Sequence, residues 1–236
     1  MSGEGVGATT EVPKGESMLR ITLSLCCAAI VAWVGTARAD DVLVTSLSGE
    51  IGMPESTSLL SPFVRLKPGQ DLWLAEGARL KLVYLGSGRE ELWRGPGRLA
   101  IGETMAVGEG MPPARIRVLA TPVARQLALT PLGDAPVDLR PRRQRSIPAV
   151  DPVQQIEATY RQLRAEAAAD DLDPELYLLS GLMENRQLDR VEDTLKDIIQ
   201  KRPGDPQVKL LAALYRKSLR NARDAGKSDS TSRSQQ

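Results

Sequence analysis

Residues 41–129 carry short runs of Val, Ile and Leu that alternate with polar positions, a pattern that predicts β-strands. Turn signals rich in Gly and Pro separate the runs at spacings typical of an all-β sandwich or barrel. In the clearest strand, Ala78–Leu85, alternate side chains fall on opposite faces, and Lys81 lies on the polar face. The pattern extends this strand into a three-strand meander and then predicts two closing strands. The meander adds Glu90–Trp93 and Arg98–Ile101, and the closing strands are Arg115–Leu119 and Arg125–Leu129.

From residue 151 onward the apolar residues recur with the period of about 3.6 that is typical of amphipathic helices. Three Asp-Pro pairs predict helix starts, because the aspartate caps free N–H groups and proline needs no N–H at the first helical position. These pairs begin at Asp151, Asp173 and Asp205. A further apolar stripe begins at Leu188, and the segment Lys201–Gly204 ends that helix. Four helices with short connections are expected to pack as antiparallel neighbours.

The two periods together predict an α+β chain in two modules. An N-terminal all-β sandwich or barrel-like domain spans residues 40–130, and a C-terminal α-helical hairpin domain spans residues 151–220. Residues 131–150 are rich in Pro and Arg, a composition that disfavours a helix or a central strand and predicts an extended linker. The polar residues 221–236 are expected to form a disordered tail. Residues 1–17 are expected to be a disordered leader or to precede the true start of the chain.

Residues 18–39 have the features of a secretory signal peptide. Arg20 supplies the basic start, Ile21–Gly35 form the apolar stretch, and Ala37-Arg38-Ala39 is a small-x-small cleavage site. The apolar stretch is shorter than the roughly 20 residues that a membrane span needs, which favours cleavage over the alternative of an uncleaved anchor. We therefore expect a periplasmic protein that has no stable membrane span after cleavage.

Composition narrows the chemistry of the mature chain. Cleavage would remove Cys26 and Cys27, the two cysteines of the sequence, and the sequence contains no histidine. The mature chain would thus lack the side chains that serve most metal sites, nucleophiles and proton transfers near neutral pH. A formal net charge of +1 provides no field that would gather nucleic acid. We expect neither a cofactor nor a nucleic-acid partner.

Residues 172–205 resemble one tetratricopeptide repeat. Apolar residues occupy its packing positions, and these are Leu178, Leu179, Leu182, Val191, Leu195 and Ile198. Pro203 stands at the terminal proline, and the spacing from Asp173 to Asp205 is 32 residues, close to the family period of about 34. The motif's alanines and glycine are replaced by larger side chains or by Arg186, and a second full repeat is missing. The resemblance implies a helical hairpin that contacts protein, with the flanking helices as caps.

Three segments of the β half resemble a FecR-type periplasmic domain. They are residues 66–72 (LKPGQDL), 76–82 (EGARLKL) and 94–99 (RGPGRL). Their order follows that family's Gly-containing turn, apolar strand and Gly-Pro-Gly corner. The resemblance implies a location in the cell envelope and contact with another protein. FecR itself has a cytoplasmic segment that binds a sigma factor, and because a signal peptide stands in its place here, we do not expect that role.

These features favour an exported, non-enzymatic adaptor that binds another protein of the cell envelope, in sensing or in assembly. By the resemblance, a tetratricopeptide unit would offer its partner a surface that includes Ser180, Met183, Glu184, Lys217 and Ser218.

The alternative is a peptidoglycan or glycan binder that stacks sugars on Trp73 and Trp93, the two tryptophans left after cleavage. Because aromatic residues are scarce, a place in the core is the competing interpretation of both. An enzyme would need a carboxylate-only or Ser/Lys mechanism, and no clustered pair of such residues supports one. Asp170, Asp171 and Asp173 lack the glycine and the distal glutamate of a calcium loop, so no metal site is expected.

Overall fold

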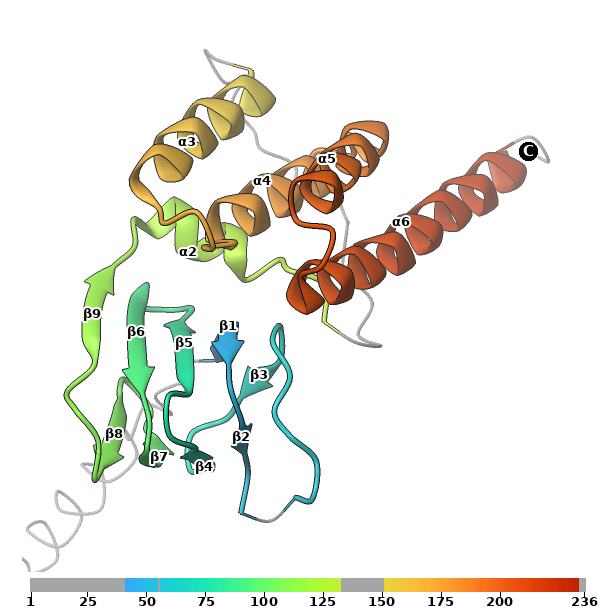
Figure 1. Ribbon diagram of the computed structural model, residues 1–236. Coiled ribbons are helices and arrows are strands. Elements are labelled where there is room, and N and C mark those ends of the chain that lie inside the picture. The colour runs from blue at the N-terminus through green and yellow to red at the C-terminus, as the bar shows by residue number, and fades with distance from the viewer. Residues whose placement is uncertain (1–40, 55, 133–150, 234–236) are drawn as a thin grey trace, which may run out of the picture. The chain divides into compact units, whose positions relative to one another are not determined.

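The computed structural model describes residues 41–54, 56–132 and 151–233, so the predicted leader, the signal peptide and most of the linker lie outside the described residues. Within them, nine strands form two antiparallel sheets, which confirms the β character of the N-terminal part (Figure 1). One sheet has the order β3-β1-β5-β6-β9 and the other β2-β4-β7-β8. The strands are β1 (Val42–Ser48), β2 (Ile51–Gly52), β3 (Arg65–Leu66), β4 (Asp71–Leu74), β5 (Arg79–Tyr84), β6 (Arg89–Arg94), β7 (Gly97–Ile101), β8 (Ala106–Glu109) and β9 (Arg115–Val118).

Helices follow the strands along the chain, so the prediction of a mixed α+β chain is confirmed. They are α2 (Thr121–Leu127), α3 (Pro152–Glu166), α4 (Asp173–Glu184), α5 (Leu188–Lys201) and α6 (Pro206–Arg233). In the part of the chain that the structure describes, no helix combines the length and the apolar character that crossing a bilayer requires.

The two sheets enclose an apolar core that follows from the alternation along each strand. In β5, the side chains of Leu80, Leu82 and Tyr84 are fully buried in this core. The four-stranded sheet contributes Leu72 and Leu99, which are also fully buried. The described strands therefore form the predicted sandwich, with each sheet burying one face against the other.

The predicted meander is wrong in its last step. Strands β5 and β6 pair with each other, but β7 pairs with β4 and β8 in the other sheet. The corner at Gly95 makes this crossing possible, because a Cβ at Gly95 would lie only 2.1 Å from the carbonyl oxygen of Ala75. A Gly-Pro-Gly sequence indicates a turn, but it does not reveal which sheet the next strand joins.

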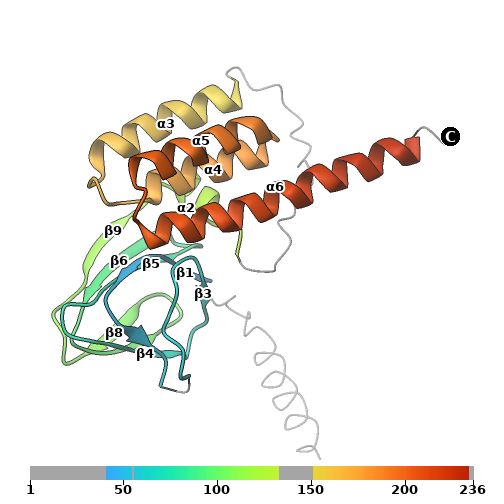
Figure 2. The same ribbon diagram turned by 45° about the vertical axis from the view of Figure 1, so that its right-hand side comes forward.

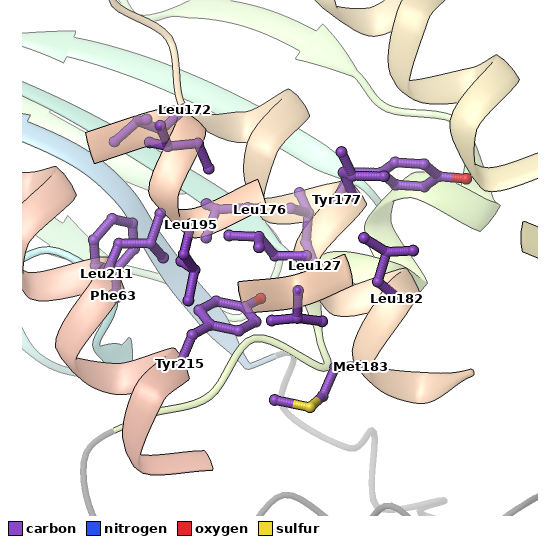
Figure 3. Packing of buried hydrophobic residues seen from close by; sticks show 14 of the residues in the cluster. Phe63, Leu127, Leu172, Leu176, Tyr177, Leu182, Met183, Leu195, Leu211 and Tyr215 are labelled. Carbon is purple, nitrogen blue, oxygen red and sulfur yellow. The ribbon is translucent and has the colours of Figure 1, made fainter. Parts of the chain in front are cut away.

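A second core lies on the opposite face of the five-stranded sheet, toward the helices. Leu43 of β1 and Val83 of β5 are buried in one cluster with the helical residues. Phe63 joins them with a left-handed backbone, φ 59°, which is unusual for a bulky side chain (Figure 3). The five-stranded sheet is thus covered on both faces, and the described residues from 41 onward belong to one compact unit.

The predicted strand Arg125–Leu129 is wrong, because helix α2 occupies this segment. Pro122 stands in its first turn, and Val123 and Leu127, four residues apart, point into the helical core. Figure 3 shows Leu127 beside Leu176. A helix of seven residues carries too few apolar repeats for its period to be told from that of a strand.

Two of the three Asp-Pro pairs act as predicted. The Asp151 carboxylate accepts a hydrogen bond from the Val153 N–H at 3.0 Å, and the Asp205 carboxylate accepts one from the Gln207 N–H at 2.8 Å. Asp173 does not cap its helix; the Asp171 carboxylate accepts the Asp173 N–H instead, at 3.0 Å. The Asp173 side chain is therefore free for another contact.

The prediction of a disordered tail at residues 221–236 is also wrong for residues 221–233, the part of it that the structure describes. Helix α6 runs from Pro206 to Arg233, well past Leu219, a buried residue of the helical core. The Arg223 guanidinium bonds to Glu192 of α5 at 2.9 Å and to Asp189 at 3.2 Å. Extending an existing helix costs little, because only the first turn carries the nucleation penalty. Polar composition alone was therefore a poor guide here.

Candidate functional site

Two of the residues predicted to contact a partner are buried. Ser180 and Met183 of α4 are each 1% exposed. The Ser180 hydroxyl lies 2.6 Å from the Tyr215 hydroxyl of α6, and Met183 packs in the same core (Figure 3). They are not accessible from solvent, so their assignment to a partner surface is wrong. The reason is that α4 packs against α2, α3 and α5, and α2 was not predicted (Figure 2).

The other three predicted contact residues lie nearer the surface. The Glu184 carboxylate is 35% exposed and pairs with the Arg125 guanidinium of α2 at 3.6 Å. Lys217 and Ser218 of α6 are half-buried. Whether any of these three contacts a partner stays a prediction.

The two tryptophans lie on different faces and cannot form one sugar-stacking platform. Trp93 of β6 is 6% exposed within the sandwich core, and its indole N–H donates to the Glu91 carboxylate at 2.9 Å. Trp73 of β4 is half-buried on the outer face of the other sheet, where it packs over Gly52. The prediction of a glycan site on both residues is therefore wrong for Trp93. Its place in the core agrees with the competing interpretation from the sequence.

Glu91 is a buried carboxylate that the sequence did not single out. Its side chain is 0% exposed and accepts hydrogen bonds from the Arg89 Nε, the Trp93 indole and the Ala106 N–H. Both carboxylate oxygens accept hydrogen bonds and the side chain is fully buried, so the group joins β6 to β8 and is not accessible to a substrate. The alternation of β6 alone would have placed a glutamate next to Trp93 on the inward face.

A charged cluster joins the five-stranded sheet to the helices, and we call it the seam cluster. It consists of Lys81, Asp171, Asp173, Glu90 and Arg117. The Lys81 ammonium lies 2.7 Å from Asp171 Oδ1 and 3.1 Å from Asp173 Oδ2. Beside it, the Arg117 guanidinium bonds to Glu90 Oε2 at 2.8 Å. The predicted polar face of β5 is thus covered by the helical part rather than by solvent.

The seam cluster holds more negative than positive charge around Lys81. Burial raises the pKa of Asp173 to about 7, an effect that Lys81 opposes and Asp171 reinforces. Burial also raises the pKa of Asp171, but the charge of Lys81 and its hydrogen bond outweigh burial and hold that pKa below its usual value. Asp173 Oδ1 is buried with no hydrogen-bond partner among the described residues. The two carboxylates share the Lys81 ammonium, which joins the sheet to the helices. Asp173 is the carboxylate whose charge changes near neutral pH.

A small pocket opens next to the seam cluster. It encloses about 250 Å³ together with the solvent at its mouth, and its lining includes Arg117, Leu163 and Asp173. The walls come from β9, α2, α3 and the start of α4. The charged groups in its lining already pair with Lys81 and Glu90, and Asp173 Oδ1 is a buried carboxylate oxygen of the lining without a described partner.

The most accessible apolar surface lies on β9, the edge strand beside β6 (Figure 1). Ile116 is 53% exposed and Val118 is 72% exposed. Natural edge strands usually avoid exposed β-branched residues, because an open strand invites pairing with another chain. Among the described residues, β9 is therefore the strongest candidate for contact with a partner.

The sequence predicted β9 as a closing strand but not as an edge. Its alternation, Arg-Ile-Arg-Val, is the same for a half-buried strand in the middle of a sheet. The signal that was missing is the order of the strands, which depends on contacts between residues far apart in the chain.

Comparison of the chain with protein-family models, with curated proteins and with solved structures finds no match. The FecR-like and tetratricopeptide-like resemblances therefore stay predictions, and the geometry above is the basis for any proposal of function.

Proposed function

We propose that this protein is an exported, non-enzymatic adaptor that binds another protein of the cell envelope through β9. The observation that carries the proposal is the outer edge of β9, which no other described strand covers, with Ile116 and Val118 open to solvent. A single exposed apolar side chain is common on any protein surface, but two on one face of an edge strand are typical of an interaction site.

The helical half supports a scaffold role in the same proposal. The antiparallel pair α4–α5 would be the tetratricopeptide-like hairpin, because Leu179, Val191 and Leu195 at its packing positions are buried. The β part would be the FecR-like module that carries the partner edge. A rigid joint through the seam cluster would hold the two parts in a fixed orientation for the partner.

Export is tested on the chain recovered from cells. If the signal peptide is cleaved after Ala39, the mature chain begins at Asp40, and N-terminal sequencing together with the intact mass will show it. An Ala39→Arg variant should accumulate uncleaved, because the cleavage site requires a small residue at that position. A mature chain that still contains residues 18–39 would contradict the proposal and favour the anchored alternative.

The partner contact is tested by placing a photo-cross-linking amino acid at position 118 in the full chain, expressed in its native envelope. We expect one dominant protein adduct, since Val118 is 72% exposed, more than any other large hydrophobic residue whose burial is described. The matched control is the same cross-linker at Lys196, a 63% exposed residue on α5, where no dominant adduct is expected. Equal adducts at both positions, or adducts to peptidoglycan alone, would reject β9 as the protein-binding edge.

A further inference from the structure

The backbone of β9 has hydrogen-bonding groups that no other described strand uses. The Leu119 N–H donates to the Gly88 carbonyl at 2.8 Å, which continues the antiparallel ladder between β6 and β9. Alternate residues of an antiparallel strand direct their N–H and C=O groups to the same side. Ile116 and Val118 therefore direct these groups away from β6, toward the free edge.

Three exposed arginines lie on the other face of the same sheet. Arg79 and Arg94 are directly opposite each other on β5 and β6, and Arg115 of β9 lies opposite Leu92, diagonal to Arg94. All three are exposed, and none makes an ion pair or a side-chain hydrogen bond with any described residue. Like charges directly opposite on neighbouring strands are destabilising, so this pair costs stability that nothing described offsets.

We propose that β9 receives an extended segment of the partner protein in which acidic and aliphatic residues alternate, added as a further strand of the five-stranded sheet. The proposal rests on the adaptor function above and specifies its partner. Alternation places every second side chain on one face of a sheet. The acidic residues would then lie beside Arg115, with Arg94 behind it, and the aliphatic residues would lie beside Ile116 and Val118. Backbone hydrogen bonds would supply affinity, and the alternating side chains would supply specificity.

A second copy of this chain fits the edge poorly. If two copies of β9 paired as antiparallel strands, residues opposite each other would lie on the same face of the sheet. Odd-numbered residues would therefore face odd-numbered ones, and even-numbered residues would face even-numbered ones. A pair centred on Ile116 places Arg115 opposite Arg117, and a pair centred on Arg117 places that arginine opposite itself. Both of these central registers bring like charges together, which is destabilising. Charge complementarity therefore favours an acidic strand over self-association.

The experiment uses the mature full chain and short fluorescent peptides, with binding measured by anisotropy at low and at physiological salt. The probe alternates glutamate with valine. One control peptide alternates lysine with valine, and a second has the composition of the probe with its glutamates in one block and its valines in another. We expect the alternating acidic peptide to bind at least about tenfold more tightly than either control. Equal binding of the block peptide would overturn strand addition, because simple charge attraction does not require alternation.

Two variants of the protein locate the site. Arg115→Glu and Val118→Lys should each weaken the alternating acidic peptide by at least about tenfold. Arg98→Glu, an exposed arginine on β7 of the other sheet, is the matched control and should leave binding within about twofold. All three positions are exposed, so melting curves should coincide with that of the parent chain. An equal loss with Arg98→Glu would overturn the location of the site.

Two results separate this inference from the adaptor function. A dominant protein adduct at position 118 without a preference for the alternating peptide would overturn strand addition and leave the adaptor function standing. A dimer in sedimentation that Val118→Lys abolishes would overturn the acidic partner as occupant in favour of a second copy.

Discussion

Replacement of Lys81 by methionine is expected to destabilise the folded chain by about 3–5 kcal/mol. The Lys81 side chain is 13% exposed, and it is the ammonium that lies within 3.1 Å of both Asp171 and Asp173. Methionine has a similar length but no charge, so two carboxylates that are 11% and 7% exposed would lose their counter-ion. Removing one partner of a buried pair leaves the other partner's desolvation cost unbalanced, which is why the effect is large.

Chemical denaturation measures the change, with Lys196→Met as its control. Lys196 pairs with Asp193 on the surface of α5, where both side chains are more than 60% exposed, and such pairs contribute little. We expect a change below about 1 kcal/mol for that variant. Adding Asp171→Asn and Asp173→Asn to Lys81→Met should restore much of the lost stability. A small effect of Lys81→Met alone would mean that the seam cluster is not shielded from water.

The sequence predicted the local structure best where one residue decides it. Asp151 and Asp205 cap helices because each carboxylate accepts a free N–H group of the first helical turn. Asp173 has the same local sequence but binds Lys81, a residue 92 positions earlier in the chain. That contact depends on how the helices meet the sheet, and no local pattern contains it.

The candidate site shows the same division. Alternation along β6 places Glu91 and Trp93 on one face of the strand. It does not reveal that the other sheet covers this face. Alternation along β9 likewise separates Ile116 from Arg117, but it does not reveal that no other described strand pairs with the outer edge of β9. Exposure is a property of the assembled sheet. Ser180, predicted at a partner surface, is therefore buried, and the exposure of Val118 follows from the strand order, which no local pattern contains.

The seam cluster links the sheet to the helices, so its ionisation should affect the whole fold. The folded-state pKa of Asp173 is raised, mainly by burial, to about 7, whereas an exposed aspartate titrates near 3.8. The folded state then binds a proton more tightly than the unfolded state between these values. The stability that this proton contributes is fully present below about pH 4 and is lost as the pH rises through 7. Asp171 works in the opposite direction, because its lowered pKa adds stability that disappears only when the pH falls below its usual range.

We therefore expect the free energy of unfolding to decrease by an amount on the order of 2–4 kcal/mol between pH 5 and pH 8. Glu90 and Arg117 also face this group and pair with each other at 2.8 Å. Asp173 is the member of the cluster whose raised pKa of about 7 lies inside this pH window. Urea denaturation at intervals of pH measures the slope. Asp173→Asn should flatten it, because the amide does not titrate, while the exposed Asp193→Asn should leave it unchanged. If Asp173→Asn retains the slope of the parent chain, another group carries the proton, and the shared ammonium of Lys81 is sufficient to keep both carboxylates ionised.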